Sequence, residues 1–493
     1  MFTPVECYNA PIMADLGEKC AVFGVYGKGL DVARLTYFGL YALQHRGQES
    51  SGIAVSDGSK VSCHKGMGLV SQVFIEEDVS KLKGHIAMGH NRYSTAGGSL
   101  LEHAQPVIVE CGDDTIGLAH NGNLPSTEAL ELFLREKGID ATGFSDSRMI
   151  AEAVAVLVKK GERVDDAVKK IYPLLTGAFS LLIMSRDKLI ALRDPCGVRP
   201  LSMAKLNGGW IFASETCALS PLGASLVRDV EPGEMVVVDA RGMRGICLVD
   251  ANPKFDVFEF VYFARPDSTL LGQSVYEVRR RSGLELAKEA PLQVDVVIPV
   301  PETGIPAAIG YSRALNIPFE MGLAKNRYIH RTFIQPEQHM RQQGVKAKLT
   351  PIVETLKGKR VAVLDDSIVR GTTSREIVAM LYEAGATEVH FLVSSPPVLY
   401  PDFYGIDTPT QENLIAATKS IPEIREFLGA TSLNYLSYEG LIRAVGVPEE
   451  RLCTSCFTGN YPIDIRERAK EVREISRSST RLQNRVASGI GAQ

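Results

Sequence analysis

The spacing of apolar residues changes near residue 252, and this change limits the possible folds more than any other feature. Before it, short β-prone runs such as CAVFGVYG, SSGIAVSDG and EMVVVDARG are separated by glycine, with few helical stretches between them. After it, apolar strands alternate with helices, as in VDVVIPV before 307–315 and KRVAVLDD before 373–384. The first pattern predicts an antiparallel α+β layer structure, and the second predicts a parallel α/β sheet.

The length and composition fit a globular enzyme with two domains. A chain of 493 residues exceeds the size of most single hydrophobic cores, so we expect two domains. The change of pattern near residue 252 places them at 20–252 and 253–475. The net charge of −4 gives no electrostatic reason to expect nucleic acid or an anionic membrane as a partner. Nine cysteines, mostly isolated, are typical of reduced thiols, and no apolar run is long enough to cross a bilayer. We therefore expect a cytoplasmic protein.

The two ends of the chain differ from the predicted domains. Residues 1–19, MFTPVECYNAPIMADLGEK, lack the basic start and the apolar middle of a secretory signal. Residues 476–493 are polar and contain glycine, so we predict a mobile tail there.

The most informative segment is RVAVLDDSIVRGTTSREIVAMLYEAGA, residues 360–386. A buried strand is followed by two acids, a short polar loop and a helix, and in open α/β sheets ligands bind just beyond the carboxyl ends of strands. The helix start favours a phosphate, while the acids suit sugar hydroxyls and a hard cation such as Mg²⁺. The candidate ligand residues are Asp365, Asp366, Ser367, Arg370, Gly371, Thr372 and Thr373.

This segment closely resembles the signature of type I phosphoribosyltransferases, which bind phosphoribosyl pyrophosphate (PRPP). The resemblance implies that the two acids hold the ribose hydroxyls and that the loop holds the 5′-phosphate. A lone Asp-Asp pair before an ordinary helix cap is the simpler alternative. The combination of Asp-Asp-Ser with Arg-Gly-Thr-Thr between a strand and a helix favours the phosphate site.

Two further stretches fit the same family. PVPETGIPAA, 299–308, looks like its pyrophosphate loop, which implies that Thr303 lies near the metal, with one Mg²⁺ per subunit. AKNRYIHRTFIQP, 324–336, carries Lys325 and Arg327, cations that suit a pyrophosphate. Taken alone, this second stretch would be a solvated basic loop.

If Cys20 acts as a nucleophile, some group must accept the proton of its thiol. A nucleophilic thiol needs a proton acceptor and an oxyanion site, and no histidine is obviously supplied as its partner. The α-amino group of Cys20 itself, with an ordinary pKa of about 7.7–8.0, is a usable base near neutrality. That chemistry requires removal of 1–19, so we interpret these residues as a propeptide.

The sequence around Cys20 supports this interpretation. CAVFGVYG, LQHRGQESSGIAV, GHNRYSTAG, LAHNGNL and SDSRMIAEAV together resemble the glutaminase domain of N-terminal-nucleophile amidotransferases, which has an αββα fold. Singly, a buried cysteine or an Asn-Gly turn would explain each stretch. The roles implied are Cys20 as nucleophile, Asn121 and Gly122 as oxyanion hole, Arg92 for the α-carboxylate of glutamine, Asp146 for its α-ammonium and, more weakly, Arg46 in the same pocket.

Together, the two resemblances extend from Cys20 to about residue 465. They imply an enzyme that converts glutamine, PRPP and water to 5-phosphoribosylamine, pyrophosphate and glutamate, at the first committed step of purine synthesis. They also imply feedback inhibition by purine nucleotides and a homotetramer. We expect a dry ammonia passage that forms when the 324–345 loop closes. A different amidotransferase with a sugar-isomerase half, or a silent PRPP-binding paralogue, are the alternatives.

One feature departs from the resemblance. Many relatives hold an iron–sulfur cluster on four cysteines, and such clusters normally need four thiolates. Here RLCTSCFTGNYP keeps Cys453 and Cys456, whereas Asp256 and Asp402 occupy the matching upstream positions. The sequence therefore favours a reduced Cys-x-x-Cys over a cluster.

Overall fold

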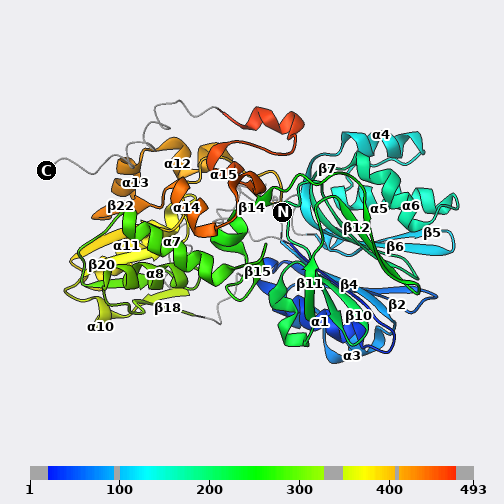
Figure 1. The fold of residues 1–493 in the computed structure, drawn as a ribbon, viewed down its shortest axis with the longest axis horizontal. Coiled ribbons are helices and arrows are strands. Elements are labelled where there is room, and N and C mark those ends of the chain that lie inside the picture. The colour runs from blue at the N-terminus through cyan, green and yellow to red at the C-terminus, as the bar shows by residue number, and fades with distance from the viewer. Residues whose placement is uncertain (1–19, 94–99, 327–347, 406–409, 474–493) are drawn as a thin grey trace, which may run out of the picture.

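The structure is a computed structural model that describes residues 20–93, 100–326, 348–405 and 410–473. The N-terminal and C-terminal halves form two lobes that lie side by side (Figure 1). Within the described ranges, no helix combines the length and the apolar character needed to cross a membrane.

The N-terminal lobe contains two antiparallel sheets, in the orders β11-β9-β10-β1-β4-β2-β3 and β13-β12-β8-β7-β6-β5. The first sheet comprises β1 (Ala21–Tyr26), β2 (Ser50–Ser56), β3 (Val61–Met67), β4 (Ile86–Arg92), β9 (Ser202–Leu206), β10 (Gly209–Ala213) and β11 (Ser225–Asp229). The second comprises β5 (Val107–Cys111), β6 (Asp114–Ser126), β7 (Thr176–Met184), β8 (Leu189–Arg193), β12 (Glu234–Asp239) and β13 (Gly242–Cys247).

Alternating side chains of β1 explain how these sheets form layers, because successive residues of a strand face opposite sides. Phe23 belongs to the core under α1 (Val32–Ala42), α2 (Val70–Val73) and α3 (Glu76–Lys81). Val22 instead packs with Leu182 of the second sheet. The far side of that sheet packs on α4 (Glu128–Glu136), α5 (Asp146–Lys159) and α6 (Val164–Ile171). The order helix, sheet, sheet, helix confirms the predicted α+β layer structure.

The C-terminal lobe is built on a parallel sheet in the order β17-β20-β21-β22. Its strands are β17 (Val296–Pro299), β20 (Arg360–Asp365), β21 (Glu388–Val393) and β22 (Ser432–Tyr435). Along β20, Ala362 and Leu364 face one core, with α7 (Val275–Glu289), α8 (Ile305–Leu315) and α14 (Tyr438–Val445). Val361 and Val363 face another, with α11 (Thr372–Glu383) and α13 (Ile421–Leu428). Burial of both faces confirms the predicted α/β sheet.

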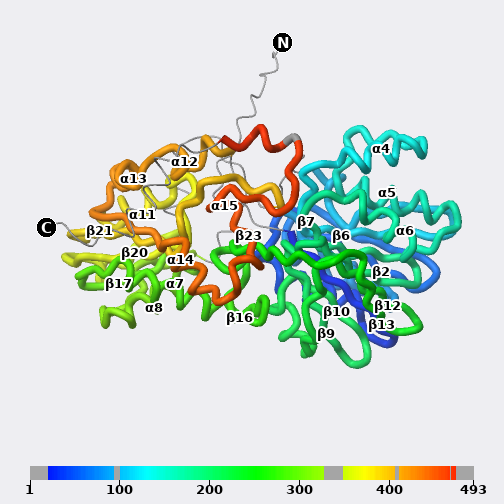
Figure 2. The backbone as a smooth tube through the Cα atoms, turned by 45° about the horizontal axis from the view of Figure 1, so that its top comes forward, coloured from blue at the N-terminus to red at the C-terminus, as the bar shows by residue number. Residues whose placement is uncertain are grey.

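Short elements connect and cover these layers. At the junction, β14 (Phe255–Asp256) pairs in parallel with β23 (Leu452–Cys453), so a C-terminal segment returns to the start of the second lobe (Figure 2). The other short strands and α-helices are β15 (Thr269–Leu270), β16 (Gln273–Ser274), β18 (Leu323–Lys325), β19 (Leu349–Pro351), α10 (Val353–Leu356), α12 (Ile415–Thr418) and α15 (Ser455–Thr458). The 3₁₀ segments are η1 (Gln44–Arg46), η2 (Leu101–His103), η3 (Tyr172–Leu174), η4 (Thr216–Ala218), η5 (Ser220–Leu222), η7 (Gln411–Asn413), η8 (Glu449–Arg451) and η9 (Arg466–Glu471), and η6 (Glu259–Phe263) is a π-helix.

Candidate active site

Cys20 directly precedes β1, the central strand of the first sheet. Its thiol is partly buried, and Sγ lies 3.9 Å from the carbonyl oxygen of Tyr93. Burial raises the pKa of the Cys20 thiol, while the charge of Arg92 lowers it and the charges of Glu49 and Asp146 raise it. The thiol is therefore protonated near neutrality, and attack by sulfur requires a base.

Arg92 is the last residue of β4, the strand that pairs with β1. Its Nη1 donates a 2.9 Å hydrogen bond to Oε2 of Glu49, and both side chains are largely buried. Oε1 of Glu49 is buried without a hydrogen-bond partner in the described part of the chain. Glu49 thus orients Arg92 beside the thiol, a role that sequence reasoning missed although Glu49 lies within QHRGQESSG.

Asn121 and Gly122 lie in β6, under the start of β1. Asn121 Nδ2 is 3.5 Å from Oγ of Ser214, and that oxygen accepts a 2.9 Å hydrogen bond from the backbone N–H of Val22. Gly122 has φ of 150°, and a Cβ there would lie 2.0 Å from the carbonyl oxygen of Ala178. Only glycine fits, so this backbone can approach a ligand closely.

Asp146 is the first residue of α5, next to β6. Its Oδ2 accepts from the backbone N–H of Leu124 at 3.3 Å, and its Oδ1 accepts from that of Ser147 at 2.6 Å. Nδ1 of the buried His120 is 3.5 Å from the same carboxylate. A fifth of the Asp146 side chain remains exposed, so the carboxylate can receive an ammonium group.

Arg46, a weaker candidate for the glutamine pocket, has contacts that its expected role does not include. Its guanidinium is fully buried and is held by Glu215 of the first lobe and by Glu259 of the second, at 2.9 and 3.0 Å for Glu259. Its Nε donates to the backbone carbonyl of Cys20 at 3.2 Å. Arg46 therefore holds the main chain of Cys20 and joins the two lobes, and its charge is compensated by the two glutamates.

The second lobe also contacts the predicted oxyanion strand. Asn123 Nδ2 donates a 2.9 Å hydrogen bond to the carbonyl oxygen of Phe403. Gly405 has φ of 108°, and a Cβ on it would lie 2.9 Å from the backbone carbon of Gly122. The segment of Phe403 and Gly405 thus packs against the backbone of β6 at Gly122 and Asn123.

We expect Gly405→Ala to lower the glutamine-dependent rate by about tenfold or more, because a shift of roughly 1 Å in positioned groups has effects of this order. Gly429→Ala is the matched control: its φ is 72°, but nothing lies within 4 Å of the added Cβ. Steady-state assays with glutamine and with ammonia would compare the two variants. Equal losses in both variants would show that backbone strain, not the clash with Gly122, is responsible.

In the second lobe, the predicted phosphate loop lies where the sequence places it. β20 ends at Asp365, and α11 begins at Thr372 after Gly371, which has φ of 77°. Because β17 and β20 are parallel neighbours, their following loops lie at the same edge of the sheet. The loop after β20 and the loop of Thr303 after β17 therefore meet.

Asp366 and Thr303 are in direct contact, since Thr303 Oγ1 donates a hydrogen bond to Oδ2 of Asp366. Oδ1 of Asp366 accepts from the hydroxyl of Ser367 at 2.7 Å, and Oδ1 of Asp365 accepts from the backbone N–H of Asp366 at 2.9 Å. Carboxylate and hydroxyl oxygens suit a hard cation such as Mg²⁺. The residues present therefore fit a magnesium site.

Arg370 supplies the cation of this loop. Its Nε and Nη1 are buried without a hydrogen-bond partner among the described residues. Buried guanidinium nitrogens in this state favour an anionic ligand, because leaving such a group unsatisfied costs about 1–3 kcal/mol. Lys325 ends β18, whereas Arg327 and most of the 324–345 loop lie outside the described residues.

Asp256, Asp402, Cys453 and Cys456 lie close enough to influence one another electrostatically. However, Arg199 already pairs with both carboxylates: its Nη1 is 2.7 Å from Oδ2 of Asp256, and its Nη2 is 3.4 Å from Oδ1 of Asp402. Burial raises the pKa of Cys453 to about 12, and that of Cys456 well above its ordinary value. Two cysteines and two carboxylates that already pair with Arg199 do not supply the four thiolates that an iron–sulfur cluster normally needs.

His45, Glu215 and Cys217 bring three metal-type ligand atoms within 4.8 Å of one another. Glu215 also accepts from Arg46 and, at 2.7 Å, from the hydroxyl of Ser268. Burial opposes ionisation of Glu215, but His45, Arg46 and Ser268 outweigh it and hold its pKa well below the usual range. This group is thus an ion-pair junction between the lobes.

Two family models match the chain. One, described as a glutamine amidotransferase domain, matches residues 90–221, and the other, a phosphoribosyl transferase domain, matches residues 275–395. The predicted order of the two domains is confirmed. The first match does not include Cys20.

Curated relatives match nearly the whole chain, and each is named amidophosphoribosyltransferase. The relative from Synechococcus elongatus is 49% identical and covers 98% of this chain and 100% of its own. Those from Mycobacterium tuberculosis and Bacillus subtilis are 48% and 45% identical, over 94% and 91% of this chain and 89% and 95% of their own.

Two solved structures are similar in fold, each with a TM-score of 0.85. One is described as the allosteric regulatory enzyme of purine biosynthesis and is 45% identical, covering 91% of this chain and 97% of its own. The other is glutamine PRPP amidotransferase from B. subtilis in complex with ADP and GMP, 44% identical over 91% of this chain and 98% of its own.

Proposed function

Because this chain belongs to the amidophosphoribosyltransferase family, we propose that its two sites divide the family's reaction between Cys20 and the loop of Asp365 to Thr373. The enzyme converts glutamine, PRPP and water to 5-phosphoribosylamine, pyrophosphate and glutamate, at the first committed step of purine synthesis. The observation that carries the residue assignment is the position of Cys20 directly before β1, whose first residue, Ala21, pairs with Asn91, the neighbour of Arg92 on β4.

In the first site, Sγ of Cys20 attacks the side-chain amide carbon of glutamine. Its proton passes to the freed α-amino group of Cys20, the tetrahedral intermediate collapses to a thioester, and ammonia leaves. Asn121 Nδ2 and the Gly122 N–H stabilise the developing oxyanion. Water then hydrolyses the thioester to glutamate. Arg92, oriented by Glu49, binds the α-carboxylate of the substrate.

Asp146 completes this site by binding the α-ammonium of glutamine. Its two oxygens already accept backbone hydrogen bonds, which fix the carboxylate at the start of α5. Arg46 is excluded from the binding group, because its guanidinium is used by Glu215 and Glu259.

In the second site, Asp365 and Asp366 bind the ribose hydroxyls, and the start of α11 with Ser367, Arg370, Gly371, Thr372 and Thr373 binds the 5′-phosphate. Lys325 and Arg327 neutralise pyrophosphate. Thr303, Asp365 and Asp366 would hold one Mg²⁺, which neutralises the charge that develops on the departing pyrophosphate. Ammonia attacks the anomeric carbon, so it must arrive unprotonated, and a dry passage between the lobes would achieve this.

The domain limits follow from the same assignment. We propose a leader at 1–19, a glutaminase domain at 20–252, a phosphoribosyltransferase domain at 253–475 and a tail at 476–493. Regulation by purine nucleotides is supported by the B. subtilis relative, which binds ADP and GMP. We also propose a homotetramer in the cytoplasm, without nucleic-acid or membrane partners.

The proposal that Cys20 becomes the first residue is tested by a reagent specific for 1,2-aminothiols, such as 2-cyanobenzothiazole. The purified enzyme should take up about one equivalent at Cys20, with the intact mass of a chain lacking 1–19, and glutamine should protect it. Cys247, which is exposed but internal, is the built-in control because it lacks a free α-amine. An active enzyme that retains the leader would refute the proposed base.

We also propose that the chain holds no iron–sulfur cluster and that Arg199 stabilises the same region. Arg199→Met leaves Asp256 and Asp402 buried without their cation, which should cost about 3–5 kcal/mol of stability. We expect a clear fall in the thermal midpoint and negligible iron and sulfide in both proteins after anaerobic purification. Arg360→Met, which breaks an exposed pair with Asp295, should change stability by less than about 1 kcal/mol. Stoichiometric iron in the parent enzyme would contradict the proposal.

A further inference from the structure

Gln105 is a buried side chain that joins two elements of the proposed glutamine site. Its Oε1 accepts a 2.8 Å hydrogen bond from the backbone N–H of His120, the residue before Asn121 in β6. Its Nε2 donates a 3.2 Å hydrogen bond to Oγ of Ser147, the residue after Asp146 in α5. One amide therefore connects the predicted oxyanion strand to the start of the helix that carries the predicted ammonium-binding carboxylate.

The backbone around Gln105 is held by the first sheet. Nζ of Lys65, in β3, donates hydrogen bonds to the carbonyl oxygens of Ala104 and Pro106, at 2.6 and 3.3 Å. Gly52, in β2, lies so close that a Cβ on it would be 2.2 Å from the carbonyl oxygen of Gln105. The main chain is thus fixed at the point from which the Gln105 amide reaches β6 and α5.

The hydroxyl of Ser147 is the point at which the side-chain contacts meet. Its Oγ is 3.1 Å from Oδ1 of Asp146 and 3.2 Å from Nδ1 of His120, in addition to its contact with Gln105. A hydroxyl donates one hydrogen and accepts up to two, whereas a carboxylate only accepts. The Ser147 hydroxyl therefore donates to Asp146 and accepts from the other two groups, so its hydrogen-bonding capacity is filled.

This network is buried, which makes its geometry strict. Gln105 is 8% exposed, and His120 and Ser147 are each 2% exposed. A buried polar group that loses its partner costs about 1–3 kcal/mol, so water does not easily replace a lost contact here. The side chain of Asp146 alone remains partly exposed, on the side where a substrate can reach it.

The network bears on catalysis because it sets a spacing. In the proposed reaction, Asp146 binds the α-ammonium of glutamine, while Asn121 and Gly122 stabilise the oxyanion at the other end of the same substrate. The two sites must keep the separation that the length of glutamine requires. A shift of about 1 Å in positioned groups can lower a rate about 10²-fold.

We propose that Gln105 and Ser147 are positioning residues that set the distance between the ammonium site and the oxyanion site. This inference rests on the proposed roles of Asp146, Asn121 and Gly122. Ser147 acts on the carboxylate of Asp146, whereas Gln105 also acts on β6 beside Asn121. The two residues should therefore have different kinetic effects, which a purely structural role would not produce.

Ser147→Ala and Gln105→Met separate these two effects. Ser147→Ala should raise KM for glutamine at least about fivefold and change kcat less than about threefold, because the ammonium contact is the same in the ground and transition states. Gln105→Met should raise KM similarly and also lower kcat about tenfold, because the N–H next to Asn121 loses its acceptor. Steady-state assays with varied glutamine at saturating PRPP measure both parameters.

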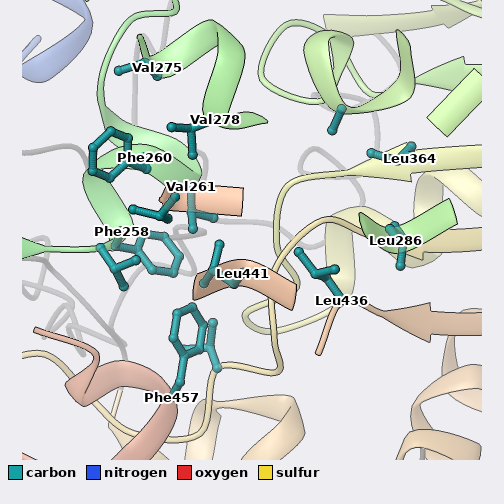
Figure 3. Close-up of a cluster of buried hydrophobic side chains, with 14 of the residues drawn as sticks. Phe258, Phe260, Val261, Val275, Val278, Leu286, Leu364, Leu436, Leu441 and Phe457 are labelled. Carbon is teal, nitrogen blue, oxygen red and sulfur yellow. The ribbon is translucent and has the colours of Figure 1, made fainter. Parts of the chain in front are cut away.

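The ammonia-dependent rate shows whether the second lobe is intact in these variants. That lobe has its own buried core, to which Leu286, Leu364 and Leu441 belong (Figure 3). The contacts of Gln105 and Ser147 described above all lie in the first lobe. Synthesis from ammonia should therefore stay within about twofold in both variants.

Two matched controls remove similar buried contacts elsewhere. Oε1 of the buried Gln411 accepts from the backbone N–H of Arg473 at 2.7 Å, and its Nε2 donates to the carbonyl oxygen of Leu399 at 3.3 Å. The buried Ser202 donates to Oδ1 of Asp229 at 2.7 Å. Gln411→Met and Ser202→Ala should leave KM and kcat for glutamine within about twofold, even where they lower the thermal midpoint.

Covalent labelling of Cys20 separates substrate positioning from damage to the thiol. The diazoketone analogue of glutamine carries the α-ammonium and α-carboxylate, whereas iodoacetamide carries neither. Ser147→Ala should lower the second-order rate of inactivation by the diazoketone at least about fivefold. Alkylation of Cys20 by iodoacetamide, measured by peptide mass, should change less than about twofold.

The inference is wrong if Ser147→Ala leaves KM for glutamine unchanged. It is also wrong if both variants lower the glutamine-dependent and ammonia-dependent rates together, in proportion to their thermal midpoints, because the network would then only support the fold. Asp146→Asn distinguishes these results from failure of the proposed site. It should raise KM for glutamine at least about tenfold, and an unchanged KM would remove Asp146 from the substrate, whatever the Gln105 and Ser147 variants do.

Discussion

Cys20→Ala is expected to abolish glutamine-dependent synthesis of 5-phosphoribosylamine while synthesis from ammonia continues. Without the sulfur nucleophile no thioester forms, and losses of about 10³-fold or more are usual when a nucleophile is removed. The ammonia-dependent reaction needs only the second lobe, where the loop of Asp366 lies far along the chain from Cys20. Paired assays with glutamine and with ammonium chloride at the same PRPP concentration measure both rates.

Cys247→Ala is the control for this prediction, because Cys247 is exposed and lies at the end of β13. It should leave both rates within about twofold, as is usual for surface substitutions. If Cys20→Ala lost both rates together, the two reactions would not be separable as proposed. If it lost neither, another group would have to be the nucleophile.

The strand, loop and helix of the proposed phosphate site could be predicted from sequence because they are local. A strand, two acids, a glycine and a helix follow one another within 360–383, and the structure ends β20 at Asp365 and begins α11 at Thr372. The meeting of this loop with Thr303 also follows from a general rule, since neighbouring parallel strands open at the same edge. No long-range information was needed for either step.

The contacts between the lobes could not be predicted in this way. The QHRGQ stretch suggests Arg46 only as a weaker candidate for the glutamine pocket, and it gives no sign of its partner Glu259, which lies 213 residues away. Gly405 carried no signal, although its close approach to Gly122 spans more than 280 residues. Glu49 was overlooked because a glutamate inside a motif gives no indication of the arginine that it will contact. These pairs of residues come together only when the chain has folded, so their charges and shapes cannot be matched from the sequence alone.

The sequence shows that Asp256 and Asp402 stand where many relatives have cysteines that bind an iron–sulfur cluster. It does not show which cation balances these two carboxylates. Two carboxylates in place of cysteines could have bound iron, or they could have required another cation. Arg199 supplies that cation, and nothing near Arg199 in the sequence indicates it. A single sequence thus identifies the two carboxylates at these positions but not the distant arginine that pairs with both of them.

Asp366→Asn is expected to lower both the glutamine-dependent and the ammonia-dependent rate by the same factor, about 10²-fold or more in kcat/KM for PRPP. The amide oxygen of asparagine can still accept from one of the Thr303 and Ser367 hydroxyls, and its NH₂ group can donate to the oxygen of the other, so the loop should keep its shape. It loses the negative charge that a divalent cation and the ribose hydroxyls need, which is worth roughly 2.7 kcal/mol for a hundredfold effect.

Asp295→Asn is the matched control, because Asp295 lies at the opposite end of the same sheet and forms an exposed pair with Arg360. That change should leave both rates within about twofold. A loss confined to the glutamine-dependent rate of Asp366→Asn would place Asp366 outside the shared PRPP site. If Asp366→Asn lowers both rates equally while Cys20→Ala lowers only the glutamine-dependent rate, both ammonia sources must use one acceptor site. Only a group that is common to both reactions can affect their rates equally.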